Sequence, residues 1–280
     1  MKLITASILF SLSLSAFAVC DATIVNHPTI DPVDGKSFVV TAREYRPHQK
    51  NAPVVFILPT IIAESVVERR LASRFCDNGI AAFILDVVKD IPAEEEIRNL
   101  NVHDESYVRA LAGVRTVMNN LSLDTSLSQN YGIMGLSLGG MQAAFIAGSE
   151  PRLKASIVVV GAGNVPSVLA YSDQKIVARQ RAERMKLFGF ENQEAYRRAL
   201  VSLVPNDPIN VAQNIKPGSM YLFIALKDKT VPTKFQLELK DKIPKPLVYE
   251  IRTNHVGAVI KAGSIHAGKI TRFFKSKLTK

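Results

Sequence analysis

The sequence predicts an α/β fold with a doubly wound, mainly parallel sheet and helices on both faces. Short, nearly continuous apolar runs recur along the chain, as in strands that are buried on both faces of a parallel sheet. Segments between them have the apolar spacing of amphipathic helices, and strands that alternate with helices favour one doubly wound sheet. In addition, residues 135–139 (GLSLG) place a serine between a predicted strand and a small-residue helix.

The elements follow in order after an extended N-terminal region. The predicted strands are 53–58 (PVVFIL), 80–85 (IAAFIL), 129–134 (QNYGIM), 155–160 (ASIVVV), 221–226 (YLFIAL) and 247–251 (LVYEI). The predicted helices of the core are about 63–76, 104–121, 140–148 and 267–277. The first of these helices has its apolar residues on one face and ends at 77–79 (DNG). A loop that contains Pro92 and three glutamates is expected before the second helix.

One segment departs from this alternation. Between the strands 155–160 and 221–226 lies a long stretch that is mostly helical in pattern, with amphipathic runs over 172–187 and 193–204. An insertion of this size between two core strands usually covers the carboxyl edge of the sheet, where ligands bind. We therefore expect a small helical cap over about 163–216, and the alternative is a pair of ordinary surface helices.

The first eighteen residues have the pattern of a secretory signal peptide. Lys2 supplies the positive start, residues 3–14 form an apolar core, and 16–18 (AFA) form a small-x-small cleavage site. We expect cleavage after Ala18, which leaves 19–280 as one domain in the periplasm or outside the cell. An uncleaved anchor and a buried first helix are the alternatives, although the apolar run is short for a bilayer span.

Two cysteines, Cys20 and Cys76, follow the expected cleavage site. In an oxidising compartment they could pair and fasten the N-terminal strand to the first helix. Equally, Cys76 could be a buried thiol in that helix, and the sequence leaves both possibilities open. Cys20 also permits a lipid anchor, but Phe17 and Val19 fit a lipoprotein signal poorly, so this is the less favoured interpretation.

Composition indicates a globular domain with a sizeable core, since 47% of the residues are hydrophobic and 21% are charged. The net charge of +10 is concentrated around 179–186 and in the last twelve residues. Solvated helix faces explain this best, and weak attraction to an anionic envelope surface is the sharper alternative. The sequence has no helix-turn-helix, zinc-ligand spacing or phosphate-binding loop, so we expect no nucleic-acid partner, metal or cofactor.

The serine turn carries the chemistry. A G-x-S-x-G match is informative only between a strand and a helix, which is where residues 135–139 lie. The serine of such a turn has a strained backbone, and side chains two residues before or after it would collide, which explains the glycines. We predict that Ser137 is a nucleophile, and the alternative is a turn serine in an inactive relative.

A serine hydroxyl needs a base, and the base needs an orienting group. Both must follow later strands to reach Ser137. Asp228 lies just beyond the strand 221–226, and His255 lies just beyond the strand 247–251. The order Ser, Asp, His along the chain is that of α/β-hydrolases.

With these residues the chain resembles an α/β-hydrolase, nearest to the dienelactone-hydrolase-like and esterase branch. The resemblance covers about residue 53 to the C-terminus and rests on three motifs: the serine turn, D-x-x-V-P at 228–232 and N-H-x-G at 254–257. It implies that His255 is the base for Ser137 and that Asp228 orients it. Dienelactone hydrolases proper carry a cysteine nucleophile, so the serine favours ester chemistry.

The resemblance also implies an oxyanion hole of two backbone N–H groups. One follows the nucleophile and is assigned to Leu138. The other comes from the loop after the first core strand, where 59–62 (PTII) replaces the usual His-Gly. We assign it to Thr60, and Ile61 is equally well placed. Ile61 and Ile62 also suggest an apolar pocket for the acyl group.

The competing candidates have weaker surroundings. Asp207 and Asp173 are alternatives to Asp228, which could itself be a surface cap between lysines, and His266 is the chief alternative to His255. We interpret the chain as an exported serine hydrolase that acts on a small-molecule acyl ester through an acyl-enzyme. The alternatives are a peptidase or amidase of the same fold and an inactive, hydrolase-like binding protein. The sequence leaves the natural substrate and the oligomeric state open.

Overall fold

Eight strands form a single sheet in the computed structural model, which describes residues 20–60, 64–87 and 92–279. Their order is β1-β2-β4-β3-β5-β6-β7-β8. β1 pairs antiparallel with β2, and β2 pairs antiparallel with β4, whereas the remaining pairs are parallel. The strands are β1 (Ala22–Ile30), β2 (Ser37–Tyr45), β3 (Ala52–Leu58), β4 (Ala81–Asp86), β5 (Leu127–Leu136), β6 (Leu153–Val159), β7 (Met220–Ala225) and β8 (Leu247–Ile251). The doubly wound, mainly parallel sheet predicted from the sequence is confirmed.

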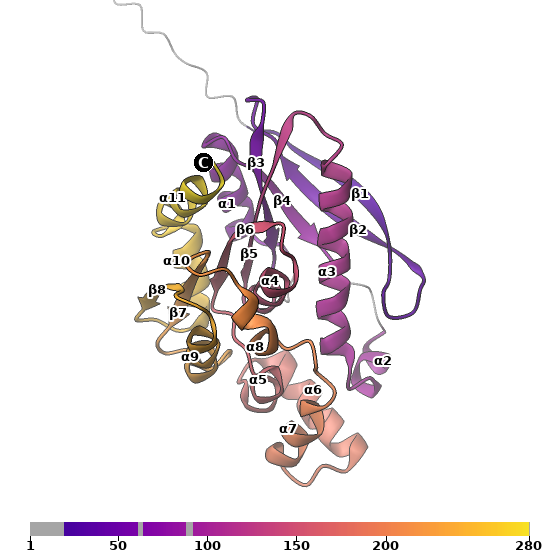
Figure 1. Cartoon of the computed structure of the whole chain (residues 1–280). Coiled ribbons are helices and arrows are strands. Elements are labelled where there is room, and N and C mark those ends of the chain that lie inside the picture. The colour runs from indigo at the N-terminus through magenta and orange to yellow at the C-terminus, as the bar shows by residue number, and fades with distance from the viewer. Residues whose placement is uncertain (1–19, 61–63, 88–91, 280) are drawn as a thin grey trace, which may run out of the picture.

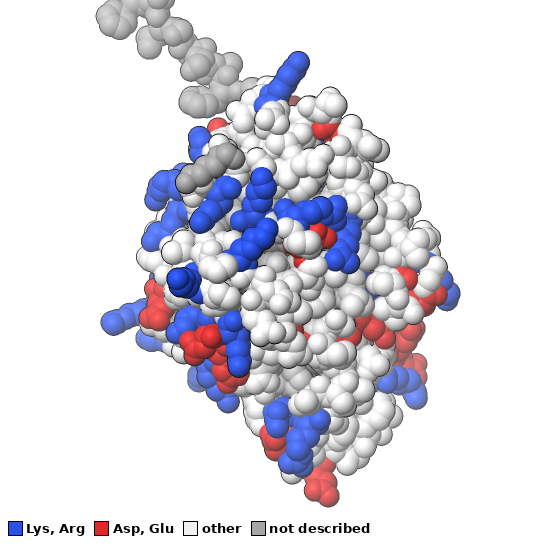
Figure 2. Space-filling view, viewed as in Figure 1, with Lys and Arg blue, Asp and Glu red and all other residues white. Residues whose placement is uncertain are grey.

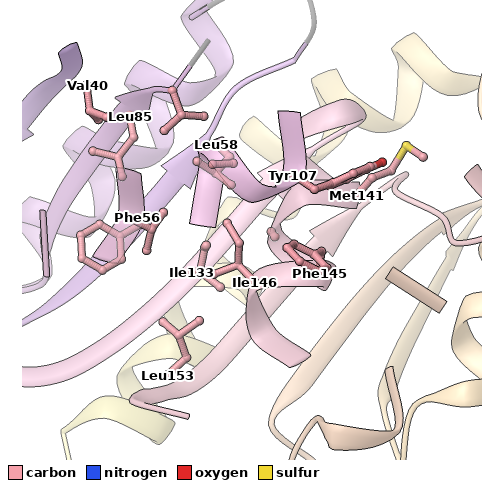
Figure 3. Packing of buried hydrophobic residues seen from close by; sticks show 14 of the residues in the cluster. Val40, Phe56, Leu58, Leu85, Tyr107, Ile133, Met141, Phe145, Ile146 and Leu153 are labelled. Atoms are coloured by element: carbon pink, nitrogen blue, oxygen red, sulfur yellow. The ribbon is translucent and has the colours of Figure 1, made fainter. Parts of the chain in front are cut away.

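Helices cover both faces of the sheet (Figure 1). One face is covered by α1 (Val66–Asp77), α10 (His255–Gly263) and α11 (Ala267–Leu278). The other is covered by α3 (Val102–Leu121), α4 (Leu138–Ser149) and α9 (Thr233–Lys242). Because the central strands are buried on both faces, β3 has no exposed residue, which explains its continuous apolar sequence. Figure 3 shows the packing between the sheet and α3 and α4.

The segment between β6 and β7 is helical, in agreement with the sequence pattern. It contains α5 (Val165–Tyr171), α6 (Lys175–Phe188), α7 (Gln193–Val201), α8 (Pro208–Val211) and the short 3₁₀ helix η1 (Ala212–Asn214). Helices α5, α6 and α7 lie together at the lower end of the molecule in Figure 1.

Some predicted boundaries were wrong. The loop expected around Pro92 contains α2 (Ala93–Arg98), whose three glutamates lie in the first turn, where they complement the positive end of the helix dipole. The first helix begins at Val66 rather than near residue 63, because Ser65 caps it and forms a capping box with Glu68. Residues 61–63 lie outside the described residues.

A disulfide joins Cys20 to Cys76. It links the residue that precedes β1 by two positions to the last turn of α1, which resolves the question that the sequence left open. The predicted signal peptide, residues 1–18, lies outside the described residues. Within the described chain, no helix combines the length and apolar character that a membrane crossing needs.

Basic side chains are unevenly distributed. Figure 2 shows Lys and Arg gathered in the upper left of this face, over α11 and its surroundings, while the lower end near α6 and α7 carries both signs. α11 ends with Lys275 and Lys277 in its last turn, as the charge at the end of the sequence predicts.

Candidate active site

Ser137 lies in the sharp turn between β5 and α4. Its backbone has φ 56° and ψ −118°, a conformation that non-glycine residues rarely adopt. Its N–H donates a 2.9 Å hydrogen bond to the carbonyl of Val159 on the neighbouring strand β6. A Cβ on Gly135 would collide with the backbone of Gly139, and a Cβ on Gly139 would collide with the carbonyls of Leu58 and Pro59. The two glycines are therefore required by close backbone packing.

His255 and Asp228 come from neighbouring strand ends. Asp228 follows β7, and His255 is the first residue of α10, after β8. The Nε2 atom of His255 lies 2.9 Å from Oγ of Ser137, and its Nδ1 atom lies 2.7 Å from Oδ2 of Asp228. The structure thus brings the three predicted site residues into one hydrogen-bonded chain.

The carboxylate of Asp228 is fully buried and is held on both oxygens. Oδ1 accepts a 2.9 Å hydrogen bond from the backbone N–H of Val231, and Oδ2 accepts one of 2.9 Å from Nε2 of Gln236. The other side-chain atom of Gln236, Oε1, accepts from the N–H of Ala225 on β7. Gln236 could not be predicted from the sequence, since no motif marks a glutamine on α9.

One of the two predicted oxyanion donors, Leu138, directly follows Ser137 and lines the same cavity. Leu138 is the first residue of α4, so its N–H is one of the N-terminal groups that have no partner within the helix. The loop after β3 packs against the same turn, because the carbonyls of Leu58 and Pro59 lie where a Cβ on Gly139 would go. Thr60 continues this loop. The alternative donor, Ile61, and the predicted acyl contact Ile62 lie outside the described residues.

The competing residues have other roles. Asp207 caps α8 and also accepts hydrogen bonds from the N–H groups of Asn164 and Val165. Burial, the largest effect, raises its pKa. Asp173 accepts a 2.9 Å hydrogen bond from the hydroxyl of Thr230. His266 packs against aromatic rings on β7 and β8, away from the serine turn.

A small cavity of about 60 Å³ adjoins the serine. Ser137, Leu138 and Met141 form one wall, and residues of α3 form another. The remainder comes from α5, α6 and the loop after β7. Because α5 and α6 belong to the segment predicted as a cap, that segment contributes directly to the surroundings of Ser137. The lining is mostly apolar, as in typical sites for small molecules.

The described residues contain no group of three or more His, Cys, Asp or Glu side chains that could hold a metal ion.

No protein-family model and no curated protein matches the chain. Solved structures do match it. Acylaminoacyl peptidase from Pyrococcus horikoshii has a TM-score of 0.68 and 19% identity over 93% of this chain, which spans 42% of that protein's length. Acetyl xylan esterase from Paenibacillus sp. R4 has a TM-score of 0.69 and 16% identity, covering 92% of this chain and 90% of the esterase.

A third match bears the name of the fold. The α/β-hydrolase GrgF from Penicillium sp. sh18 has a TM-score of 0.64 and 14% identity, covering 93% of this chain and all of GrgF. The chain has the α/β-hydrolase fold. At these identities the likeness concerns the fold, and α/β-hydrolase scaffolds carry different chemistries. The chemistry of this chain therefore depends on the side chains that its own fold brings together.

Proposed function

We propose that this protein is an exported serine hydrolase that cleaves carboxylic esters. The observation that carries the proposal is the chain of two hydrogen bonds from Ser137 through His255 to Asp228. A nucleophile, a base and an orienting carboxylate in this order form the arrangement that activates a serine hydroxyl.

In the first half of the reaction, Nε2 of His255 removes the proton from Ser137 as Oγ attacks the acyl carbonyl. This requires His255 to carry its proton on Nδ1, and the carboxylate of Asp228 favours that tautomer by accepting the hydrogen bond. The imidazolium that forms then lies against a buried negative charge, which stabilises it. Its proton next passes to the leaving alcohol, and an acyl-enzyme on Ser137 remains.

The developing oxyanion needs fixed donors. The N–H groups of Leu138 and Thr60 are the proposed pair, and the N-terminal end of α4 adds the positive end of a helix dipole. Water, activated by His255, then attacks the acyl-enzyme and regenerates Ser137. No step in this sequence calls for a cofactor.

Two features support an ester as the substrate class. The nucleophile is a serine in a largely apolar cavity, which suits a short acyl chain. The matching structures of similar length to this chain include an acetyl xylan esterase. The acylaminoacyl peptidase is more than twice as long as the matched region, so peptide-bond cleavage is the second candidate.

Export is supported by two observations. Residues 1–18 have the pattern of a signal peptide, and the Cys20–Cys76 disulfide belongs to a class of bond that persists in oxidising compartments. Attraction of the basic surface to an anionic envelope is a further proposal, which rests on the charge distribution alone.

Labelling with a fluorophosphonate tests the reaction class. The wild-type protein should be labelled, and the variants Ser137→Ala and His255→Ala should not. Ser172→Ala is the matched control, because Ser172 lines the same cavity while its hydroxyl donates to the carbonyl of Thr230. Absence of labelling in folded wild-type protein would overturn the proposal and favour a non-catalytic binding role. Comparison of matched p-nitrophenyl esters and p-nitroanilides then separates an esterase from an amidase.

A further inference from the structure

One residue in the wall of the cavity beside Ser137 has a hydroxyl group without a hydrogen-bond partner. Among the described residues, the hydroxyl of Tyr107 is the only buried side-chain atom of the cavity wall without a hydrogen bond. Tyr107 lies on α3 and is 1% exposed, so its hydroxyl is shielded from bulk solvent. In Figure 3 the hydroxyl end of Tyr107 points toward Met141, which also lines the cavity.

The other polar side chains of the wall are engaged with the protein. Ser172 donates to the carbonyl of Thr230, and Thr230 in turn donates to Asp173. The Oε1 atom of Gln174 accepts from two N–H groups at the start of α6. The Nε2 atom of His103 lies 3.3 Å from a guanidinium nitrogen of Arg184. Tyr107 thus differs from these neighbours because its hydroxyl group donates no hydrogen bond within the protein.

That donor keeps its proton at neutral pH. Burial, followed by the negative charges of Asp207 and Asp104, raises the pKa of Tyr107 well above its ordinary value. Burial and the adjacent charge of Arg184 lower the pKa of His103 to about 3, so its imidazole is neutral and acts as acceptor for the guanidinium. The cavity therefore offers a neutral hydroxyl group rather than a charge, which suits a neutral ligand atom.

An unsatisfied hydroxyl in a protein interior is unfavourable, and a phenylalanine would fill the same apolar space without this penalty. These facts indicate that a bound molecule satisfies the hydroxyl. We propose that Tyr107 binds a neutral oxygen in the acyl chain of the substrate, so that the preferred esters carry an ether, keto or hydroxyl oxygen there. This inference rests on the proposed ester hydrolase activity.

The acyl part of the ester is the part that this cavity fits. Ser137 and Leu138 lie in its wall, so the chain attached to the reacting carbonyl enters it directly. The leaving alcohol must depart after the first step, whereas the acyl group stays bonded to Ser137 until water attacks. A small, mostly apolar cavity beside Ser137 suits the group that stays. Tyr107 would then act as a specificity-determining residue.

Matched pairs of esters test the proposal. p-Nitrophenyl methoxyacetate and butyrate have acyl chains of similar shape that differ by an ether oxygen, and methoxypropionate and pentanoate form a second pair with the oxygen one atom farther out. The variant is Tyr107→Phe, which removes only the hydroxyl. Tyr131→Phe is the control, because Tyr131 is also buried but does not line the cavity.

We expect Tyr107→Phe to lower kcat/KM for the oxygen-bearing ester of at least one pair by about tenfold or more, and to change its partner by less than about threefold. Comparing variant with wild type for each ester cancels the intrinsic reactivity of the two substrates. Tyr131→Phe should leave the ratio within each pair unchanged. The thermal midpoint of Tyr107→Phe should be no lower than that of the wild type, since no hydrogen bond is lost.

If Tyr107→Phe changes kcat/KM equally for both members of both pairs, the inference is overturned. A bound water would then be the hydrogen-bond partner of the hydroxyl. If a fluorophosphonate labels Ser137 but no ester is turned over, the labelling rates of alkyl and alkoxyalkyl phosphonates make the same comparison. If no phosphonate labels the protein, the proposed serine hydrolase function is contradicted. The inference about Tyr107, which rests on that function, is then contradicted as well.

Discussion

Gln236 donates a 2.9 Å hydrogen bond to Oδ2 of Asp228, the same carboxylate oxygen that lies 2.7 Å from Nδ1 of His255. Gln236 also bridges the end of β7 and the following loop, through the N–H of Ala225 and the carbonyl of Val231. This glutamine therefore fixes the orientation of a carboxylate that, in the proposed mechanism, fixes the orientation of the imidazole.

Replacement of Gln236 by leucine should lower kcat by about tenfold and change KM less, since Gln236 donates to Asp228 and does not itself line the cavity. Stability should also fall, by about 1–3 kcal/mol, because the buried groups of Ala225 and Val231 lose their partner. Activity should be expressed per labelled Ser137, so that misfolded molecules do not count. A normal kcat per labelled site would assign Gln236 a purely structural role.

The serine turn should not tolerate a methyl group at Gly139. Gly139→Ala would force the start of α4 away from the carbonyls of Leu58 and Pro59, which also displaces Leu138 and the loop that contains Thr60. We expect a large loss of both stability and esterase activity. Gly268→Ala is the control, since Gly268 lies within α11 and a Cβ there meets only the flexible ends of Arg74 and Arg272. That substitution should be neutral or stabilising by up to about 1 kcal/mol.

Glu150 should make the free energy of unfolding depend on pH in the acid range. The hydrogen bonds from Arg152, followed by those from Arg115, lower the pKa of this buried carboxyl from 4.5 to about 2. Since the folded pKa is depressed, its stabilisation is present above pH 4.5 and is lost as the pH falls toward 2. Both arginines are almost half exposed, so we expect Glu150→Gln to cost about 1–2 kcal/mol at pH 7.

Urea unfolding of the wild type and of Glu150→Gln at a series of pH values measures this effect. The difference in unfolding free energy between the two proteins should decrease steadily as the pH falls below 4.5. A difference that stays constant down to pH 2 would mean that the charge of Glu150 contributes nothing.

The disulfide should contribute measurably to stability. Cys20 and Cys76 are 56 residues apart in sequence, so the bond restricts a long loop of the unfolded chain. The double variant Cys20→Ala/Cys76→Ala should lose about 2–4 kcal/mol of unfolding free energy. A reductant should destabilise the wild type by a similar amount and leave the double variant unchanged. Equal sensitivity of the two proteins to the reductant would refute a structural disulfide.

The three residues of the hydrogen-bonded chain could be predicted from their positions alone. Ser137 directly follows β5, and Asp228 and His255 come a few residues after β7 and β8. Because parallel strands end at one edge of the sheet, residues at these positions meet whatever the details of packing. Their proximity was therefore predictable, and their catalytic roles remain proposals.

Gln236 and Tyr107 could not be found in this way, because neither follows a strand. Each lies within a helix, and what sets it apart is a tertiary property: a hydrogen bond to Asp228 in one case, and the lack of any partner in the other. The sequence also did not predict α10, which begins at His255 itself. Its start depends on the side chain of Asn254, which caps the helix by accepting from Gly257, a local signal that the strand pattern does not reveal.

The central claim is that Ser137 carries the acyl group during turnover, and intact mass spectrometry tests it most directly. The protein is mixed with a p-nitrophenyl ester, the reaction is quenched with acid within the first turnovers, and the intact mass of the protein is measured. We predict a mass increase equal to one acyl group, located on the peptide that contains Ser137 and absent from Ser137→Ala. Hydrolysis that persists in Ser137→Ala, or an acyl group found on another residue, would contradict the account.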